Sequence, residues 1–92
     1  MHSFKVKIQG RVQGVGFRYY TEREAIRLGI TGWVRNCVDG SVEAFVCGEE
    51  DSIQAMLAWL KHGPSPADVS AVYIEEMQTE ETSIPTHFEI KG

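Results

Sequence analysis

The chain passes from a strand pattern to a helix pattern within one short segment, Gly10-Arg11-Val12-Gln13-Gly14-Val15-Gly16-Phe17-Arg18. The glycines in this segment permit backbone conformations that point successive N–H groups into one concavity. The helix that follows adds unpaired N–H donors and the positive end of its dipole. Arg18 stands at the start of that helix, and its planar guanidinium matches the oxygens of a phosphate or a carboxylate. The segment therefore predicts a phosphate site.

A plainer interpretation of the same segment is a tight turn shaped by its glycines, with Arg18 as a solvated charge. The better-known phosphate loops do not match. A dinucleotide fingerprint requires Gly-x-Gly-x-x-Gly, and residues 14–19 lack the third glycine. Nothing in the sequence resembles the Gly-Lys-Ser/Thr end of a nucleotide P-loop. The coincidence of glycines, a helix start and an arginine nevertheless favours a phosphate site over a plain turn.

Hydrophobic periodicity predicts the elements around this segment. Alternating apolar residues from Phe4 to Ile8 predict a strand with one buried face, and Gly29 is placed to end a helix over 17–28. One face of that helix carries Phe17, Tyr20, Thr21, Ala25 and Leu28. The other expected elements are strands at 31–37, 41–47, 69–77 and 88–91 and a helix that starts at the acidic residues 49–51 and ends before Gly63.

This order of elements predicts an α+β fold. Two strand–helix–strand units joined by a hairpin form a ferredoxin-like βαββαβ sandwich, in which an antiparallel sheet carries both helices on one face. An extra C-terminal strand is appended. With 92 residues, 42% of them hydrophobic and 24% charged, we expect a single domain over residues 1–92. The fold hosts many unrelated functions, so chemistry has to be argued from the site.

The register of the hairpin around Asp39-Gly40 has two solutions. A two-residue turn places Arg35 on the same side as the apolar residues Val42, Ala44 and Val46. A five-residue connection over 37–41 places Val34 and Asn36 there instead. We prefer the longer connection, because it moves a cation out of the core.

Charge and hydropathy narrow the function classes. The formal net charge is −4, so the general surface repels polyanions, and a small phosphorylated molecule suits it better than a nucleic acid. The apolar stretches fall short of the roughly 20 residues of a membrane-spanning helix. The N-terminal residues 1–5 lack the apolar region of a secretion signal. We therefore expect a cytoplasmic protein that binds neither nucleic acid nor membrane.

The cysteines and histidines do not predict a metal site. Cys37 and Cys47 flank the expected hairpin from opposite ends, roughly 17 Å apart, which is too far for a disulfide. Neither has the spacing of metal ligands, so we expect reduced thiols. His2, His62 and His87 are scattered over a terminus, a helix end and a late loop, which indicates surface residues.

Asn36 is the second candidate for chemistry, because it ends the strand that leads into the hairpin. An asparagine before a turn is a common capping choice, and that interpretation stays open. Its amide can also donate and accept at once, which suits holding a water in one orientation. In a ferredoxin-like domain the first two strands end at the same edge of the sheet, so the Asn36 amide could reach the glycine loop.

Several motifs together resemble the acylphosphatase family. They are residues 10–18, Gly32-Trp33-Val34-Arg35-Asn36, Asp39-Gly40-Ser41-Val42-Glu43, Trp59-Leu60 and Phe88-Glu89-Ile90. The resemblance covers essentially the whole chain. One departure is Cys37, where a threonine is frequent in the family. The family mechanism does not depend on that position, so only fine tuning is affected.

The resemblance implies a small monomeric enzyme that hydrolyses the carboxyl-phosphate bond of acyl phosphates without a metal or cofactor. Inorganic phosphate is then its product and competitive inhibitor. By the same resemblance Arg18 corresponds to the phosphate-binding arginine, and Asn36 to the residue that orients the attacking water. The implied phosphate cradle is formed by the amides of Val12, Gln13, Gly14, Val15, Gly16, Phe17 and Arg18.

Other functions compete with hydrolysis. A non-catalytic regulatory module that binds acyl phosphates or other anions would use the same fold and loop. RNA binding is disfavoured by the acidic balance and by the lack of a clear pair of exposed stacking aromatics. A metal carrier of this topology would need a loop with paired cysteines, where this chain has glycines and an arginine. Because the site reads mainly the phosphoryl group, we expect the acyl part of a substrate to stay in solvent.

Overall fold

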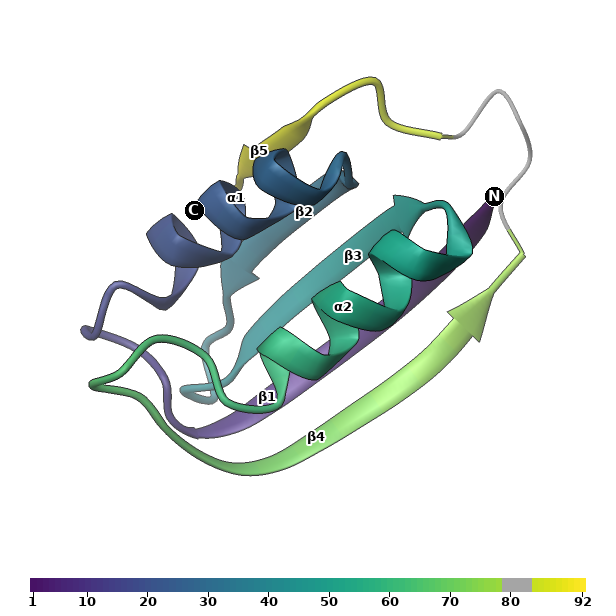
Figure 1. Ribbon diagram of the computed structural model, residues 1–92. Helices are drawn as coiled ribbons and strands as arrows, with labels where there is room; N and C mark the ends of the chain where they lie inside the picture. The colour runs from purple at the N-terminus through teal and green to yellow at the C-terminus, as the bar shows by residue number, and fades with distance from the viewer. Residues whose placement is uncertain (79–83) are drawn as a thin grey trace.

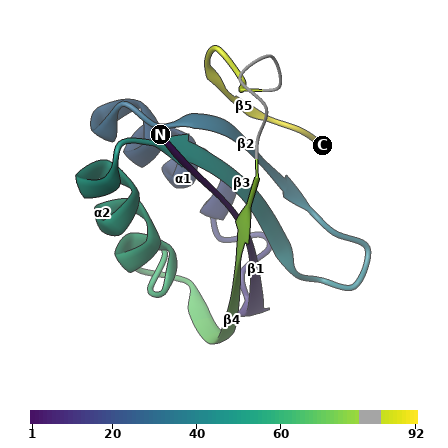
Figure 2. The same ribbon diagram turned by 90° about the vertical axis from the view of Figure 1, so that its right-hand side faces the viewer.

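Five strands form one sheet in the computed structural model, which describes residues 1–78 and 84–92. The elements are β1 (His2–Arg11), α1 (Phe17–Leu28), β2 (Thr31–Asn36), β3 (Val42–Gly48), α2 (Glu50–Leu60), β4 (Asp68–Met77) and β5 (Phe88–Ile90). Both helices cover the same face of the sheet (Figure 1 and Figure 2). The predicted ferredoxin-like βαββαβ arrangement with an appended C-terminal strand is confirmed.

The strand order is β4-β1-β3-β2-β5, so β4 and β5 lie at opposite edges of the sheet (Figure 1). Neighbouring strands are antiparallel except at one edge, where β5 pairs parallel with β2. The expected antiparallel sheet of the βαββαβ unit is confirmed, and the appended strand β5 makes the five-stranded sheet mixed. Strands β4 and β2 run in opposite directions, so the two edge strands, β4 and β5, also run in opposite directions.

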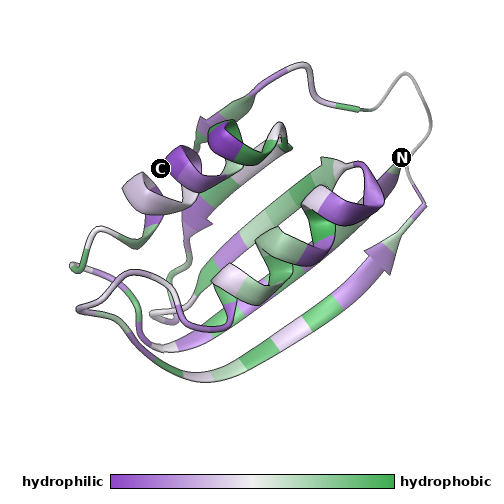
Figure 3. Cartoon of the chain, in the orientation of Figure 1, coloured by the Kyte–Doolittle hydropathy of each residue, from purple (hydrophilic) through white to green (hydrophobic). Residues whose placement is uncertain are grey.

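The core lies between the sheet and the two helices. Its buried apolar side chains include Val6, Ile8, Phe17, Ala25, Val34, Val42, Ala44, Val46, Ile53, Met56, Leu57 and Leu60. Figure 3 shows the matching apolar stripe on the side of α2 that faces the sheet. Each of these side chains other than the two alanines contributes about 1.5–3 kcal/mol by leaving water. The alternation in β1 and the helical spacing in α2 thus both predict the buried face correctly.

The buried face of α1 is narrower than its sequence suggests. Phe17, Thr21 and Ala25 are buried, but Tyr20 is 42% exposed. Residues four apart stack along one line of a helix, and Tyr20 lies beside that line. Its ring packs against Tyr19 instead, with the ring centroids 5.0 Å apart. Tyr20, which the sequence places roughly on the same helical face as Phe17, is thus a packing residue of the surface and not of the core.

The hairpin between β2 and β3 has the longer of the two connections considered. Asn36 pairs with Val42 and Arg35 pairs with Glu43, which leaves residues 37–41 as the connection. Arg35 is exposed, and its guanidinium donates to the Glu43 carboxylate at 2.6 and 2.8 Å. The argument that a cation would not enter the core is therefore confirmed, and Asn36 ends β2 at the start of the connection.

In the part of the chain that the structure describes, neither helix is long and apolar enough to cross a membrane.

Candidate active site

The loop between β1 and α1 has an unusual backbone. Gly14 and Gly16 have φ angles of 76° and 79°, in the left-handed region that residues other than glycine rarely adopt. Gly16 is the N-cap of α1, and the first turn of that helix contains no acidic residue. The positive end of the helix dipole is therefore not neutralised by its own side chains, which favours an anion at this position.

A hollow of about 250 Å³ opens beside this loop. It is lined by Val12, Gly14, Gly16, Phe17, Arg18, Tyr19, Asn36 and Ile90. Ligand pockets in proteins run from roughly 300 to 1,000 Å³, so the hollow suits a small anion better than a nucleotide. Six of the eight predicted site residues contribute to it, and the structure thus brings Arg18 and Asn36 to one place.

Arg18 is the arginine that lines the hollow. Within the described residues its guanidinium makes no ion pair, whereas Arg27 is paired with Glu24 and Arg35 with Glu43. Arg18 is also partly buried in the wall of the hollow. A guanidinium without a carboxylate partner retains its donors and its charge for a bound anion.

The Gln13 side chain does not line the hollow, and it has contacts in addition to the predicted role of the Gln13 backbone amide. Its side-chain Nε2 donates to the carbonyl oxygens of Cys37 and Ser41, each at 2.9 Å. These carbonyls belong to the connection that directly follows Asn36. The glycine loop and the end of β2 are therefore tied together by one side chain. The only sign of this contact in the sequence is that Gln13 has a long amide side chain in a loop of mostly small and apolar residues.

The 37–41 connection is itself held by Asp39. The carboxylate accepts from the Ser41 hydroxyl at 2.6 Å and from the Ser41 backbone N–H at 3.0 Å, and it pairs with Lys7 Nζ at 2.9 Å. The Ser41 hydroxyl bond, followed by the Lys7 bond, holds the pKa of Asp39 well below its usual range. A lowered pKa means that this stabilisation is present above the ordinary carboxyl pKa and is lost as the pH falls below it.

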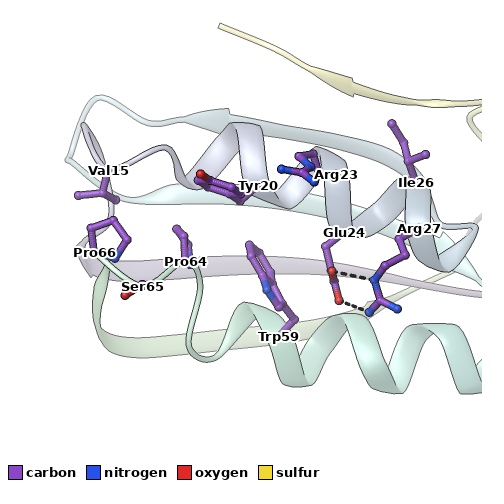
Figure 4. A pocket seen from close by; sticks show the side chains of 10 residues that line it. All are labelled: Val15, Tyr20, Arg23, Glu24, Ile26, Arg27, Trp59, Pro64, Ser65 and Pro66. Atoms are coloured by element: carbon purple, nitrogen blue, oxygen red, sulfur yellow. Dashed lines mark hydrogen bonds and ion pairs between the residues drawn. The ribbon is translucent and has the colours of Figure 1, made fainter.

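Val15 is the other predicted cradle residue that does not line the hollow. Its side chain lies on a groove of about 900 Å³ between α1 and α2 (Figure 4). Tyr20, Trp59 and Pro64 line the same groove, which also contains the paired Glu24 and Arg27. The groove is larger than the hollow, but its walls are largely apolar and the Arg27 charge is neutralised by Glu24. It contains the Arg23 guanidinium but neither the left-handed glycines nor Asn36.

Metal ligands do not gather in the described part of the chain, where no three His, Cys, Asp or Glu side chains are grouped to hold an ion. Cys37 and Cys47 are free thiols at opposite ends of the β2–β3 hairpin. Burial raises the pKa of the Cys47 thiol, whose sulfur lies 3.3 Å from the Ser3 hydroxyl. Neither His62 nor His87 lines the hollow, and both are exposed.

The fold and the site define a class of ferredoxin-like α+β domains with an arginine beside a glycine-rich strand-to-helix loop. The Acylphosphatase family profile matches residues 4–90. A curated relative named Acylphosphatase, from Rhizobium etli, is 52% identical over 88 residues, which is 96% of this chain and 92% of the relative. The chain belongs to the acylphosphatase family.

Solved structures agree with this assignment. The crystal structure of acylphosphatase from Bacillus subtilis superposes with a TM-score of 0.92 at 34% identity and covers 100% of both chains. The structure of an acylphosphatase from Coxiella burnetii gives a TM-score of 0.90 at 40% identity, over 98% of this chain and 92% of that one. The similarity therefore extends over the whole fold, including the β1–α1 loop and β5.

Proposed function

We propose that the chain hydrolyses the carboxyl-phosphate bond of acyl phosphates and releases a carboxylate and inorganic phosphate. The observation that carries the proposal is the meeting of the glycine loop, Arg18 and Asn36 at one hollow of about 250 Å³. Membership of the acylphosphatase family supports the same reaction. The roles below are those that the contacts of these residues favour.

The loop and Arg18 bind the phosphoryl group. Phosphoryl transfer passes through a loose transition state whose charge is spread over three equatorial oxygens, so catalysis is mostly positioning and electrostatic stabilisation. The amides of residues 12–18 and the Arg18 guanidinium supply donors for these oxygens. By comparison with oxyanion-hole donors, each well-aimed donor lowers the barrier by about 3 kcal/mol. The absence of an acidic residue from the first turn of α1 leaves the helix dipole to act in the same sense.

Asn36 holds the attacking water in line with the bond that breaks. Its amide donates to and accepts from the same water, which fixes the water's orientation. The two hydrogen bonds of Gln13 support this role, because they tie the backbone after Asn36 to the phosphate loop. A small error in the position of the water would cost much of the rate. The proton of the water passes to a phosphate oxygen.

The leaving group explains why so few side chains are needed. The described residues that line the hollow include no histidine and no carboxylate. A carboxylate leaving group has a conjugate acid with a pKa of about 4, so it departs without a general acid. The side chains present at the hollow are therefore suited to an acyl phosphate, and poorly suited to a phosphate ester with an alcohol leaving group.

Phosphate release from benzoyl phosphate, measured with and without a chelator, tests the proposal. We expect the same turnover in both conditions and competitive inhibition by inorganic phosphate. Binding of phosphate without any turnover would instead support a non-catalytic regulatory module on this fold. Loss of activity with the chelator would contradict a mechanism that uses only amides and a guanidinium.

The proposal includes a single domain that works as a cytoplasmic monomer on small molecules. The net charge of −4 supports a small anion as the ligand over a nucleic acid. Gel filtration at assay concentrations tests the monomer, and cell fractionation tests the location. An assay of RNA binding at low salt, where electrostatic attraction is strongest, tests the exclusion of nucleic acid.

A further inference from the structure

We propose that Tyr19 and Ile90 form an apolar rim that contacts the acyl group of the substrate. On this basis the enzyme favours acyl phosphates with an aromatic or branched apolar acyl group over acetyl phosphate. The inference rests on the proposed function and names the substrate class for it. It replaces the expectation that the acyl part stays wholly in solvent.

The first observation is that two large apolar side chains are exposed at the same hollow. Tyr19 is 53% exposed and Ile90 is 39% exposed, and both line the hollow that contains Arg18 and Asn36. Single exposed apolar side chains are common and need no explanation. These two come from α1 and β5, far apart in the sequence, and converge on one site, which gives them a shared surface for a ligand.

The Tyr19 ring is held in place before any ligand arrives. It makes an edge-on contact with the Tyr20 ring at 5.0 Å between centroids and 76° between planes. The Arg23 guanidinium lies 5.8 Å from the centroid of the Tyr19 ring. A ring that is already ordered loses little freedom when an acyl group packs on it, so more of the contact energy contributes to binding.

Ile90 is positioned by the parallel pairing of β5 with β2. Ile90 lies beside Val34 in the sheet, and the backbone N–H of Lys91 donates to the Val34 carbonyl at 2.8 Å. Phe88, two residues earlier on the same face of the strand, is buried. Phe88 thus anchors β5 under α1, and Ile90 extends the same apolar face to the hollow.

The hollow has room for part of the acyl group beside the phosphoryl group. Its volume is about 250 Å³, whereas one water takes about 30 Å³ of liquid volume. With the phosphoryl group held at the glycine loop and Arg18, the acyl group extends along the lining toward solvent, where the Tyr19 and Ile90 side chains are exposed. Apolar area that leaves water there stabilises the complex in proportion to the size of the acyl group.

The test compares kcat/KM for benzoyl phosphate and acetyl phosphate in the wild type and in Tyr19→Ala, Ile90→Ala and the double variant. The intrinsic difference in reactivity between the substrates cancels when the benzoyl-to-acetyl ratio is compared across variants. We expect each single variant to lower this ratio about fivefold, the scale of removing one methylene-sized contact. Hydrolysis of acetyl phosphate and inhibition by inorganic phosphate should change less than about twofold.

The controls are matched by residue type. Tyr73→Ala and Ile26→Ala remove an exposed tyrosine and an exposed isoleucine that do not line the hollow, and they should leave the ratio unchanged. Tyr19→Phe retains the ring and should retain the ratio, which separates the apolar contact from a role of the hydroxyl. Thermal unfolding of each variant shows whether the fold is intact.

Three results would overturn the inference. An unchanged ratio in an active double variant means that the acyl group lies in solvent. Equal losses on both substrates mean that Tyr19 or Ile90 acts on the phosphate site. If the wild type hydrolyses neither substrate, the proposed function itself fails and the rim fails with it.

Discussion

The two strand-to-helix connections of this chain have the same place in the topology, but the charges at the two helix starts differ. Between β1 and α1 lies a glycine loop, and α1 begins at a left-handed Gly16 with no acidic residue in its first turn. Between β3 and α2 a single residue, Glu49, leads into a first turn that contains Glu50 and Asp51. The first helix start is left positive, and the second is neutralised by its own side chains.

This contrast shows that the anion site is a property of one loop and not of the fold. Both connections belong to equivalent strand–helix units on the same face of one sheet (Figure 1). The hollow with Arg18 and Asn36 lies at the first connection. At the second, the carboxylates stabilise the helix and would repel a phosphate. Substitutions at each connection can therefore separate anion binding from simple helix stability.

The largest effect is expected from Arg18→Ala. Removing the unpaired guanidinium should lower kcat/KM for benzoyl phosphate by about 10³-fold or more, the scale of losing a charged transition-state donor. It should also weaken inhibition by inorganic phosphate. Steady-state kinetics with phosphate as inhibitor measures both. Arg27→Ala is the matched control, because Arg27 is on the same helix but paired with Glu24, and it should retain near-normal activity.

Asn36→Ala should have the next largest effect and a different signature. We expect kcat to fall at least about a hundredfold while the affinity for inorganic phosphate stays within about twofold, because the residue positions water and not the anion. Comparison of kcat with the inhibition constant of phosphate measures the split. Normal turnover by this variant would remove the water-positioning role.

Gly14 and Gly29 provide a matched test of the loop backbone. Their φ angles are 76° and 73°, and a Cβ at either position would meet no atom within 4 Å. Alanine at each should therefore cost a similar ~1–2 kcal/mol of backbone strain, seen as a similar fall in the melting temperature. Only Gly14→Ala should weaken phosphate inhibition, by about fivefold for ~1 kcal/mol of lost binding. Equal effects on phosphate would contradict a special role for the loop.

The smallest effect is expected at the second connection. Glu50→Gln and Asp51→Asn should each lower the free energy of unfolding by about 0.3–1 kcal/mol, because a carboxylate no longer meets the positive end of α2. Denaturant unfolding at low ionic strength measures the loss, which should shrink as salt is added. Activity on benzoyl phosphate should be unchanged. A clear change in activity would mean that the two connections are not independent.

Local pattern and charge were enough to predict much of this molecule. The start of α1 at Phe17 and its end before Gly29 follow from the glycines that flank the helix. In the structure both flanking glycines, Gly16 and Gly29, have left-handed φ angles. The 37–41 connection follows from the cost of burying Arg35. These features depend on residues close in sequence or on the simple exclusion of charge from the core.

Contacts between distant residues could not be predicted in this way. The parallel pairing of β5 depends on where Phe88 packs, so the place of Ile90 at the hollow was missed. The exposure of Tyr20 depends on how α1 lies on the sheet. The side chain of Gln13 bonds to carbonyls 24 and 28 residues away, which no local pattern specifies.

Those two bonds from Gln13 have a consequence for motion. The hydrogen bonds join the glycine loop, which is proposed to bind the anion, to the hairpin end next to Asn36, which is proposed to hold the attacking water. Local opening of the hairpin end must break these bonds and releases the loop at the same time. A bound phosphate that orders the loop therefore slows opening of the hairpin as well. Amide hydrogen exchange at Cys37 and Ser41 would report occupancy of a site that neither residue touches.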